Sequence, residues 1–316
     1  MKIDKTLFYQ TLRIRMVEEA IAREYPKQEM RCPTHLCIGQ EAIAAGVCAA
    51  LAKEDVVFST HRSHGHYLAK GGNLPAMIAE LYGKATGCSG GIGGSMHLID
   101  LKANFLGAAP IVASTISVAV GVAFARKMQN KPGIVVAFFG DAAVEEGTAH
   151  EVMNFAVLKR LPVLFVCENN LYSTVTHLRD RQPRRPIADF ARGHGMKALT
   201  IDGQDVRQVF ARAKKFVDTV RSGTGPMFLE CLTYRYREHC GPNEDGPALR
   251  PAAELMRWKR NDPVVGMTRF FKEKDLDAMR EKIGKEIRDA FTFARQSPFP
   301  VVNMRDDHLV YKESRP

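Results

Sequence analysis

The sequence predicts an α/β fold with a mainly parallel sheet flanked by helices. Two short apolar runs, 134–139 and 163–167, are rich in β-branched and aromatic residues, which is typical of strands buried on both faces of a parallel sheet. Between them Val152, Phe155 and Ala156 recur at helical spacing and give one apolar face. The whole segment therefore predicts one βαβ unit.

Polar residues follow both strands of this unit. Asp141 comes after the first strand and Asn170 after the second, about thirty residues later. Parallel neighbours end at the same edge of a sheet, where open α/β sheets bind ligands. Carboxylate, amide and backbone oxygens are hard ligands that suit Mg²⁺ held together with a diphosphate. An ordinary βαβ unit with polar strand ends is the simpler alternative, which these residues alone leave open.

The length and composition of the chain are ordinary for a soluble protein. Its 316 residues are enough for one large domain or two, and the hydrophobic (45%) and charged (25%) shares are ordinary. We expect an α/β domain over 1–296 and a C-terminal tail over 297–316. No apolar run is long enough to span a membrane and the first residues contain no apolar signal core, so a cytoplasmic location is expected. The seven cysteines are scattered without a C-x-x-C pair, which argues against a zinc site or disulfide framework.

The net charge of +10 permits an anionic partner. The basic residues are nevertheless spread along the chain, and no nucleic-acid-binding motif accompanies them. The densest cluster, Arg179, Arg181, Arg184 and Arg185, is typical of a solvated loop. Nucleic-acid binding is therefore not expected.

The first part of the chain predicts two helices with a turn between them. The segment 6–24 is amphipathic and Pro26 ends it. A second helix begins at Gly39, with Glu41 placed near its positive N-terminal end, and runs through an alanine-rich segment to Leu51. His35 lies in the turn just upstream. A lone histidine in such a place is more often structural than catalytic, so its importance depends on the rest of the chain.

A strand at 56–59 leads into a group of histidines. His61, His64 and His66 follow it, together with Arg62. Their spacing could indicate zinc, but the i,i+4 pair of a helical site and a nearby Cys or Asp ligand are missing. Arg62 fits better as an anion clamp, because a guanidinium binds diphosphate oxygens in a bidentate manner.

The remaining segments alternate between glycine-rich loops, helices and strands. The glycine-rich stretch 87–97 matches neither a dinucleotide fingerprint nor a phosphate loop. Small residues dominate a helix over 113–128, which we expect to be buried and to pack on a symmetry-related or partner helix. The polar, proline-containing stretch 172–186 predicts a mobile loop near the site. His239 lies further along the chain, beyond the strand expected over 226–232. Further expected strands cover 197–201 and 226–232, and further helices cover 205–221, 253–259, 265–272 and 275–294.

Several of these motifs together resemble the alpha subunit of the first, thiamine-diphosphate-dependent component of 2-oxo-acid dehydrogenase complexes, of the pyruvate and acetoin dehydrogenase type. The Gly140-Asp141 to Asn169-Asn170 spacing is similar to the thiamine-diphosphate fingerprint. The resemblance extends from about Leu7 to Arg295. It is carried in order by His35 with Gly39-Gln40-Glu41, His61 to His66, Gly93 to His97, Asn104-Phe105, Ile111-Val112, Gly140 to Tyr172, Tyr234-Arg235-Tyr236 and His239.

The resemblance implies a thiamine-diphosphate-binding fold and a role for each matching residue. Mg²⁺ would be held by Asp141, Asn170 and the Tyr172 carbonyl. Substrate and the reactive carbon of the cofactor would face His35 and His64, and His239 would be catalytic as well. Cofactor contacts would come from His61, Arg62, Val112, Asp141, Ala142, Ala143, Asn170 and His239.

The resemblance also implies a second chain. The cofactor would lie at an interface with a beta subunit, in an α2β2 assembly, because the glutamate that activates the aminopyrimidine belongs to that subunit in this family. We therefore expect the chain alone to be inactive. The implied reaction is decarboxylation of a pyruvate-like 2-oxo acid, with acyl transfer to the lipoyl group of an acyltransferase.

Departures from the family pattern keep other functions open. His61 stands where tyrosine is common, Pro110 and Ala142 replace glycines, and Cys240 replaces the serine phosphorylated in animal pyruvate dehydrogenases. They suggest a different 2-oxo acid or acceptor, and carboligation to an aldehyde or ketone is one alternative. A non-catalytic scaffold or regulatory subunit is another. A nicotinamide dehydrogenase is disfavoured, because no glycine-rich first βα turn is convincing.

Overall fold

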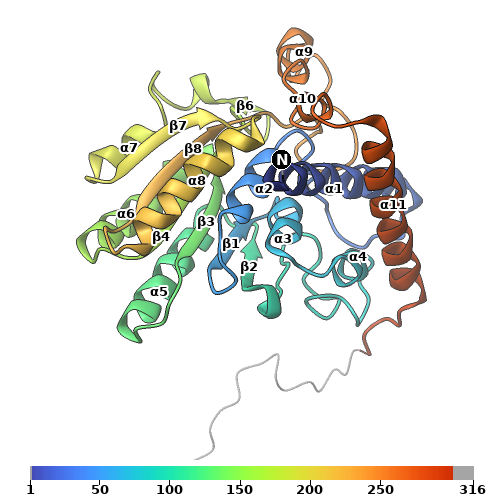
Figure 1. Ribbon diagram of the computed structural model, residues 1–316, viewed down its shortest axis with the longest axis horizontal. Helices are drawn as coiled ribbons and strands as arrows, with labels where there is room; N and C mark the ends of the chain where they lie inside the picture. The colour runs from blue at the N-terminus through green and yellow to red at the C-terminus, as the bar shows by residue number, and fades with distance from the viewer. Residues whose placement is uncertain (1, 302–316) are drawn as a thin grey trace, which may run out of the picture.

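The centre of the molecule is one six-stranded parallel sheet. The computed structural model describes residues 2–301, and Figure 1 shows the sheet with helices on both faces. The strands lie in the order β2-β1-β3-β4-β8-β7, and every neighbouring pair is parallel. This confirms the predicted fold class. Their bounds are β1 Val56–Thr60, β2 Phe105–Ala109, β3 Val135–Gly140, β4 Val163–Asn169, β7 Lys197–Asp202 and β8 Met227–Leu232.

Alternate residues of the central strands belong to two separate hydrophobic cores. In β3, Val136 and Phe138 lie in one core, whereas Val135 and Phe139 lie in the other. Since side chains alternate between the two faces of a strand, both faces of the sheet are buried. The apolar runs of β3 and β4 follow from this arrangement, because neither face can carry polar residues into water.

Different helices cover the two faces. One core includes residues of α5 (Ser114–Met128), α6 (Gly147–Leu158) and α7 (Ala188–Gly193). The other includes residues of α1 (Lys2–Glu24), α2 (Glu41–Ala49) and α8 (Val206–Arg221). An outer group, visible beside α1 in Figure 1, consists of α3 (His64–Lys70), α4 (Leu74–Leu81) and α11 (Glu273–Gln296). Short elements complete the description: β5 Tyr172–Ser173, β6 Thr176–His177, α9 Ala252–Lys259, α10 Val265–Thr268, and the 3₁₀ turns η1 Tyr25–Lys27, η2 Leu101–Ala103, η3 Asp141–Glu145 and η4 Leu178–Asp180.

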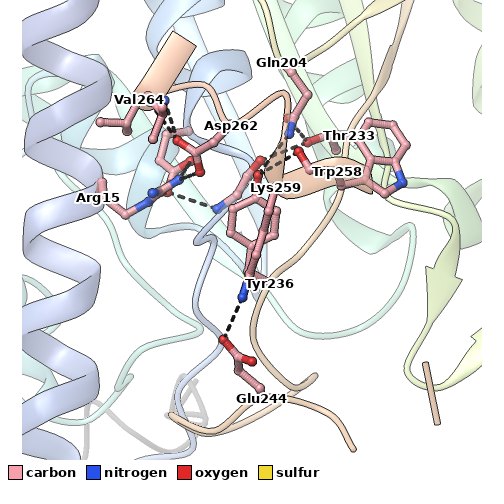
Figure 2. Close-up of polar contacts among 12 residues, drawn as sticks. Arg15, Gln204, Thr233, Tyr236, Glu244, Trp258, Lys259, Asp262 and Val264 are labelled. Carbon is pink, nitrogen blue, oxygen red and sulfur yellow. Dashed lines mark hydrogen bonds and ion pairs between the residues drawn. The ribbon is translucent and has the colours of Figure 1, made fainter. Parts of the chain in front are cut away.

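A buried ion-pair network ties the first helix to the C-terminal region. Arg15 of α1 donates to Glu41 at 2.5 Å and to Asp262 at 2.9 Å, and Figure 2 shows the Arg15–Asp262 contact beside the turn that leads into α10. Glu41 also accepts the backbone N–H of Gly39 at 3.0 Å. Glu41, the acid expected near the positive N-terminal end of α2, is therefore paired directly with the guanidinium of Arg15. The network fixes the turn in which Gly39 adopts φ +99°.

A second set of hydrogen bonds connects the end of β8 to this same turn, and Figure 2 shows the one between Thr233 and Gln204. Thr233 donates to Gln204 at 2.9 Å and, at 3.3 Å, to the carbonyl of Gly39. Tyr236 donates its backbone N–H to Ile38 at 2.9 Å. The segment before His239 is therefore held against the segment after His35, although the two are far apart in the chain.

The structure also corrects several expectations about individual elements. The 113–128 helix is not buried all round, because Val118 and Gly121 are exposed. The stretch expected as a mobile loop contains the β5–β6 hairpin and η4. The strand β2 and the helices α3, α4 and α7 were not expected, and α10 is shorter than the helix expected over 265–272. Most of the expected tail, 302–316, lies outside the described residues, and its boundary after α11 stays a prediction.

Gly46 offers a direct test of helix packing between α2 and α8. A Cβ atom at Gly46 would lie 2.7 Å from Cγ1 of Val209 and 3.0 Å from the backbone nitrogen of Phe210. Overpacking of this kind costs roughly 1–3 kcal/mol, so Gly46→Ala should lower the free energy of unfolding measured in urea.

Gly121→Ala is the matched control for this substitution. Gly121 lies in α5, and its Cβ would meet no atom within 4 Å, so helix propensity alone should leave stability unchanged or raise it by up to about 1 kcal/mol. Equal effects of the two substitutions would contradict the described α2–α8 contact.

Candidate functional site

The site is built on the carboxyl ends of β3 and β4. These strands pair in register up to Gly140 and Glu168, and Asp141 and Asn170 follow their ends within two residues. Both side chains are buried, and both line the same cavity of about 270 Å³. The prediction that the two residues meet at one edge of the sheet is confirmed.

Most of the other predicted site residues line this cavity too. They come from segments far apart in the sequence, because the cavity lies where the turn before α2, the end of β1, the start of α5 and the end of β8 converge. Besides Asp141 and Asn170, the cavity is lined by His35, His61, Arg62, Val112, Ala142, Ala143, Tyr172 and His239.

His64 is the exception, and the expectation that it faces a substrate is wrong for this structure. Its side chain is fully buried in α3. Glu18 lies 2.5 Å from its Nδ1 and the Ser95 hydroxyl 2.7 Å from its Nε2. Both ring nitrogens of His64 therefore have hydrogen-bond partners within the protein. Glu18 also accepts the backbone N–H of Cys37, so His64 helps to fix the cavity wall from behind.

His66 likewise points away from the other histidines. Its Nδ1 lies 2.8 Å from the Ser59 hydroxyl and its Nε2 lies 3.2 Å from Glu168. Within residues 2–301, no group of three or more His, Cys, Asp or Glu side chains could hold a metal ion. The described residues therefore give no support to a zinc site at these histidines.

Three imidazoles gather at one side of the cavity. The ring centroids of His35, His61 and His239 lie 4.8 to 5.3 Å apart. Burial, with the positive charge of Arg62 next in importance, lowers the pKa of His35 to about 3, of His61 to about 2 and of His239 to about 4. All three rings are therefore neutral at pH 7, when each can donate one hydrogen bond and accept another.

Arg62 holds two walls of the cavity together. It is buried, and it donates to the carbonyl of Leu36 at 2.6 Å and to that of His239 at 3.2 Å. Nearby, Nδ1 of His35 is buried without a hydrogen-bond partner. A buried polar atom of this kind usually has a partner, and its place in the cavity wall indicates a ligand that supplies one.

The donors predicted for a metal ion have a defined orientation. Asn170 accepts the backbone N–H of Tyr172 at 3.1 Å through Oδ1, and its Nδ2 donates to Gln40 at 3.2 Å. Leu171, between them, has φ +71°, which is rare for a non-glycine residue. A carboxylate, an amide and a backbone carbonyl form a set of hard oxygen donors that fits Mg²⁺.

Three of the seven described non-glycine residues with positive φ line the cavity or directly follow a lining residue. Besides Leu171, the lining residues Ala113 and Thr174 have φ +63° and +54°, and such strain occurs preferentially at functional sites. Ala142, which replaces the glycine of the fingerprint, is not among the described non-glycine residues with positive φ. Its methyl group is therefore accommodated without backbone strain.

Sequence reasoning missed Arg181, the residue that pairs with Asp141. The cluster of four arginines was interpreted as a solvated loop, and this holds for Arg179, whose side chain is 75% exposed. The side chain of Arg181 is only 10% exposed and forms ion pairs with Asp141 and Glu145. Burial raises the pKa of Asp141, and the charge of Arg181 opposes this rise. No sequence pattern distinguishes Arg181 from its neighbours.

Glu168 was missed as well, although a signal was available. It lies at the end of β4 directly before the two asparagines and lines the cavity, where His66 is its partner. A carboxylate at the edge of a predicted parallel sheet could have been included on the same argument as Asp141.

Comparison with known proteins agrees with this geometry. The family model described as dehydrogenase E1 component matches residues 9–303. The chain belongs to this family. No helix among residues 2–301 has the length and apolar character needed to cross a membrane.

Relatives of the family are similar over nearly the whole chain. The alpha subunit of acetoin:2,6-dichlorophenolindophenol oxidoreductase from Bacillus subtilis is 36% identical over 93% of this chain and 89% of its own length. The pyruvate dehydrogenase E1 component subunit alpha of Zymomonas mobilis is 37% identical over 92% of this chain and 83% of its own. The chloroplastic subunit alpha-3 from Arabidopsis thaliana is 38% identical over 90% and 69%.

The neutral histidines predict a pH-dependent stability. The unfolded chain takes up protons on these residues near pH 6.5, whereas the folded chain resists uptake until pH falls to between about 4 and about 2. The unfolded state therefore binds more protons below pH 6.5, and stability must fall as pH is lowered from about 7 to about 4.5. Urea unfolding at several pH values should show this fall, and His61→Asn should make it shallower.

His97→Asn is the control for this measurement, because His97 is exposed and lies outside the cavity. It should leave the pH dependence of stability as in the wild type. An identical pH dependence for wild type and His61→Asn would contradict the assignment of His61 as a buried neutral ring.

Proposed function

We propose that the chain is the alpha subunit of a two-chain enzyme that decarboxylates a pyruvate-like 2-oxo acid with thiamine diphosphate and transfers the acyl group to a lipoyl acceptor. The observation that carries the proposal is the meeting of Asp141, Asn170 and Tyr172 at one sheet edge, in a cavity shared with neutral histidines. Membership in the dehydrogenase E1 component family supports thiamine diphosphate as the cofactor.

The cavity residues fit the two groups that this reaction needs. Mg²⁺ would be held by Asp141, Asn170 and the carbonyl of Tyr172, which are hard oxygen donors. Thiamine diphosphate, when bound, supplies the centre that accepts the negative charge released by decarboxylation. The side chain of Val112 is 46% exposed, and its backbone is where the aminopyrimidine would be bound.

The histidines would move protons and exclude water. A neutral imidazole can donate a hydrogen bond to oxygen as negative charge develops there, and its unprotonated nitrogen can accept a proton. The unpaired Nδ1 of His35 is the atom best placed to bind the substrate in this way. His61 and His239 pack edge-on against the same ring, which restricts its orientation.

The surface beside the cavity supports a partner chain. Ile111 and Val118 are 72% and 53% exposed, and they flank the start of α5 next to the cavity wall. Of the carboxylates that line the cavity, Asp141 would hold the metal and Glu168 is paired with His66. The carboxylate that activates the cofactor would then come from a beta subunit, in an α2β2 assembly. An acyltransferase carrying the lipoyl group would be the next partner.

Carboligation to an aldehyde or ketone remains the second candidate. It is favoured by His61, which stands in the cavity wall in place of the tyrosine common in the family, and by Pro110, which lines the same wall. Both changes lie where a second substrate would enter. Product analysis with pyruvate, either with a lipoamide acceptor or with acetaldehyde, separates the two reactions.

Asp141→Asn tests the site itself. This substitution keeps the shape of the side chain and removes the charge that would bind Mg²⁺. Removing a residue that only hydrogen-bonds a metal ligand typically lowers metal affinity about 10–100-fold. Removing the charge of the ligand itself should therefore lower the affinity for Mg²⁺ and thiamine diphosphate by more than about 100-fold, as measured by calorimetric titration. Asp180→Asn, an exposed carboxylate in η4, is the control and should bind like wild type.

The same titration distinguishes an enzyme from a scaffold. If the wild-type complex binds neither thiamine diphosphate nor Mg²⁺, the chain acts as a scaffold or regulatory subunit and the proposed function is wrong.

Reconstitution tests the need for a second chain. The chain alone should show no turnover of a 2-oxo acid, because the activating carboxylate is expected from the partner. Mixing the chain with a beta subunit of the same family should produce turnover, measured as release of CO₂. Full turnover by the isolated chain would refute the two-chain proposal.

A further inference from the structure

Arg181 has an unusual place for an arginine in a polar loop. It follows η4 on the segment that returns from the β5–β6 hairpin, among residues that are mostly exposed. The side chain of Arg179, two positions earlier, is 75% exposed, whereas that of Arg181 is 10% exposed. Burial of an arginine is costly unless its charge is paired, so the contacts of Arg181 require an explanation.

Each of the three guanidinium nitrogens of Arg181 donates a hydrogen bond. Nε donates to the carbonyl of Thr176 at 3.3 Å. One terminal nitrogen donates to Glu145 and the other donates to Asp141. Both carboxylates belong to η3, the turn that follows β3. Arg181 therefore connects the hairpin after β4 to the turn after β3, beside the lining residue Asp141.

We propose that Arg181 is a positioning residue for Asp141, which it holds in the orientation needed to bind the metal ion. This inference rests on the proposed function, which assigns Asp141 as a metal ligand. The bond to Arg181 uses Oδ2 of Asp141, so Oδ1 is the carboxylate oxygen that would bind the cation. Residues that bind metal ligands from behind in this way fix their orientation and tune affinity.

The geometry explains why this position needs arginine. A planar guanidinium can bind two carboxylates and a carbonyl at once through separate N–H groups. The ammonium of lysine is a single compact charge and cannot reproduce this fork. Glu145 completes the arrangement, because it shares the arginine charge and limits how far the guanidinium can turn toward the cavity.

The experiment measures metal affinity in the complex of the chain with its beta subunit. Mn²⁺, which gives an electron paramagnetic resonance signal when free in solution, is titrated in the presence of thiamine diphosphate. We expect Arg181→Gln to weaken Mn²⁺ binding by about 10–100-fold, and Arg181→Lys to weaken it by an intermediate factor. Arg179→Gln, a charge change on the exposed neighbour, is the matched control and should bind Mn²⁺ as wild type does.

A second measurement separates positioning from general loss of structure. If Arg181 acts through Asp141, raising the Mn²⁺ concentration in proportion to the lost affinity should restore cofactor binding and kcat in Arg181→Gln. A variant with a misfolded loop would not be rescued by metal, and that result would overturn the proposal.

The remaining outcomes are also decisive. If Arg181→Gln binds Mn²⁺ more tightly than wild type, Arg181 competes with the metal, and if it binds equally, Arg181 has no role in metal binding. Either result overturns this proposal while wild-type binding still supports the proposed function. Failure of the wild-type complex to bind Mn²⁺ and thiamine diphosphate would instead overturn both.

Discussion

Parallel pairing of β3 and β4 is the constraint on which the site depends. Because the strands run side by side and in register up to Gly140 and Glu168, Asp141 and Asn170 arrive at one edge without any specific contact between them. Two hydrophobic cores bury both faces of these strands, so the edge is held by the most stable part of the molecule. Polar groups at this edge can therefore be oriented for binding, since their backbone does not have to be ordered first.

Around this edge, hydrogen bonds and ion pairs hold the segments that form the rest of the cavity wall. The turn before α2 is fixed by Arg15 and Glu41, and the segment before His239 is bonded to that turn. His35 and His239 reach the cavity from these two segments, whereas His61 directly follows the end of β1. The base of the cavity is therefore set by the sheet, whereas much of its rim is set by hydrogen bonds between loop segments.

The sequence was sufficient for five of the six strands of the sheet, all but β2, and for Asp141 and Asn170 at its edge, because hydrophobic runs and strand-end polar residues are local signals. It was insufficient for Arg181 and His64. Arg181 looks like three neighbouring arginines, and only the fold brings it to Asp141. His64 looks like a site histidine by spacing, and only the packing of α1 against α3 shows that Glu18 and Ser95 occupy both ring nitrogens. Long-range contacts of this kind leave no periodic trace in a sequence.

Ala142 has a consequence for how such proteins are identified. Its backbone lies outside the left-handed region, so the position does not require the glycine that the thiamine fingerprint specifies. A pattern search that insists on this glycine would discard chains of this kind, although their strand ends present the same oxygen atoms. A query that keeps the aspartate and the paired asparagines and tolerates a small side chain between them would recover such chains.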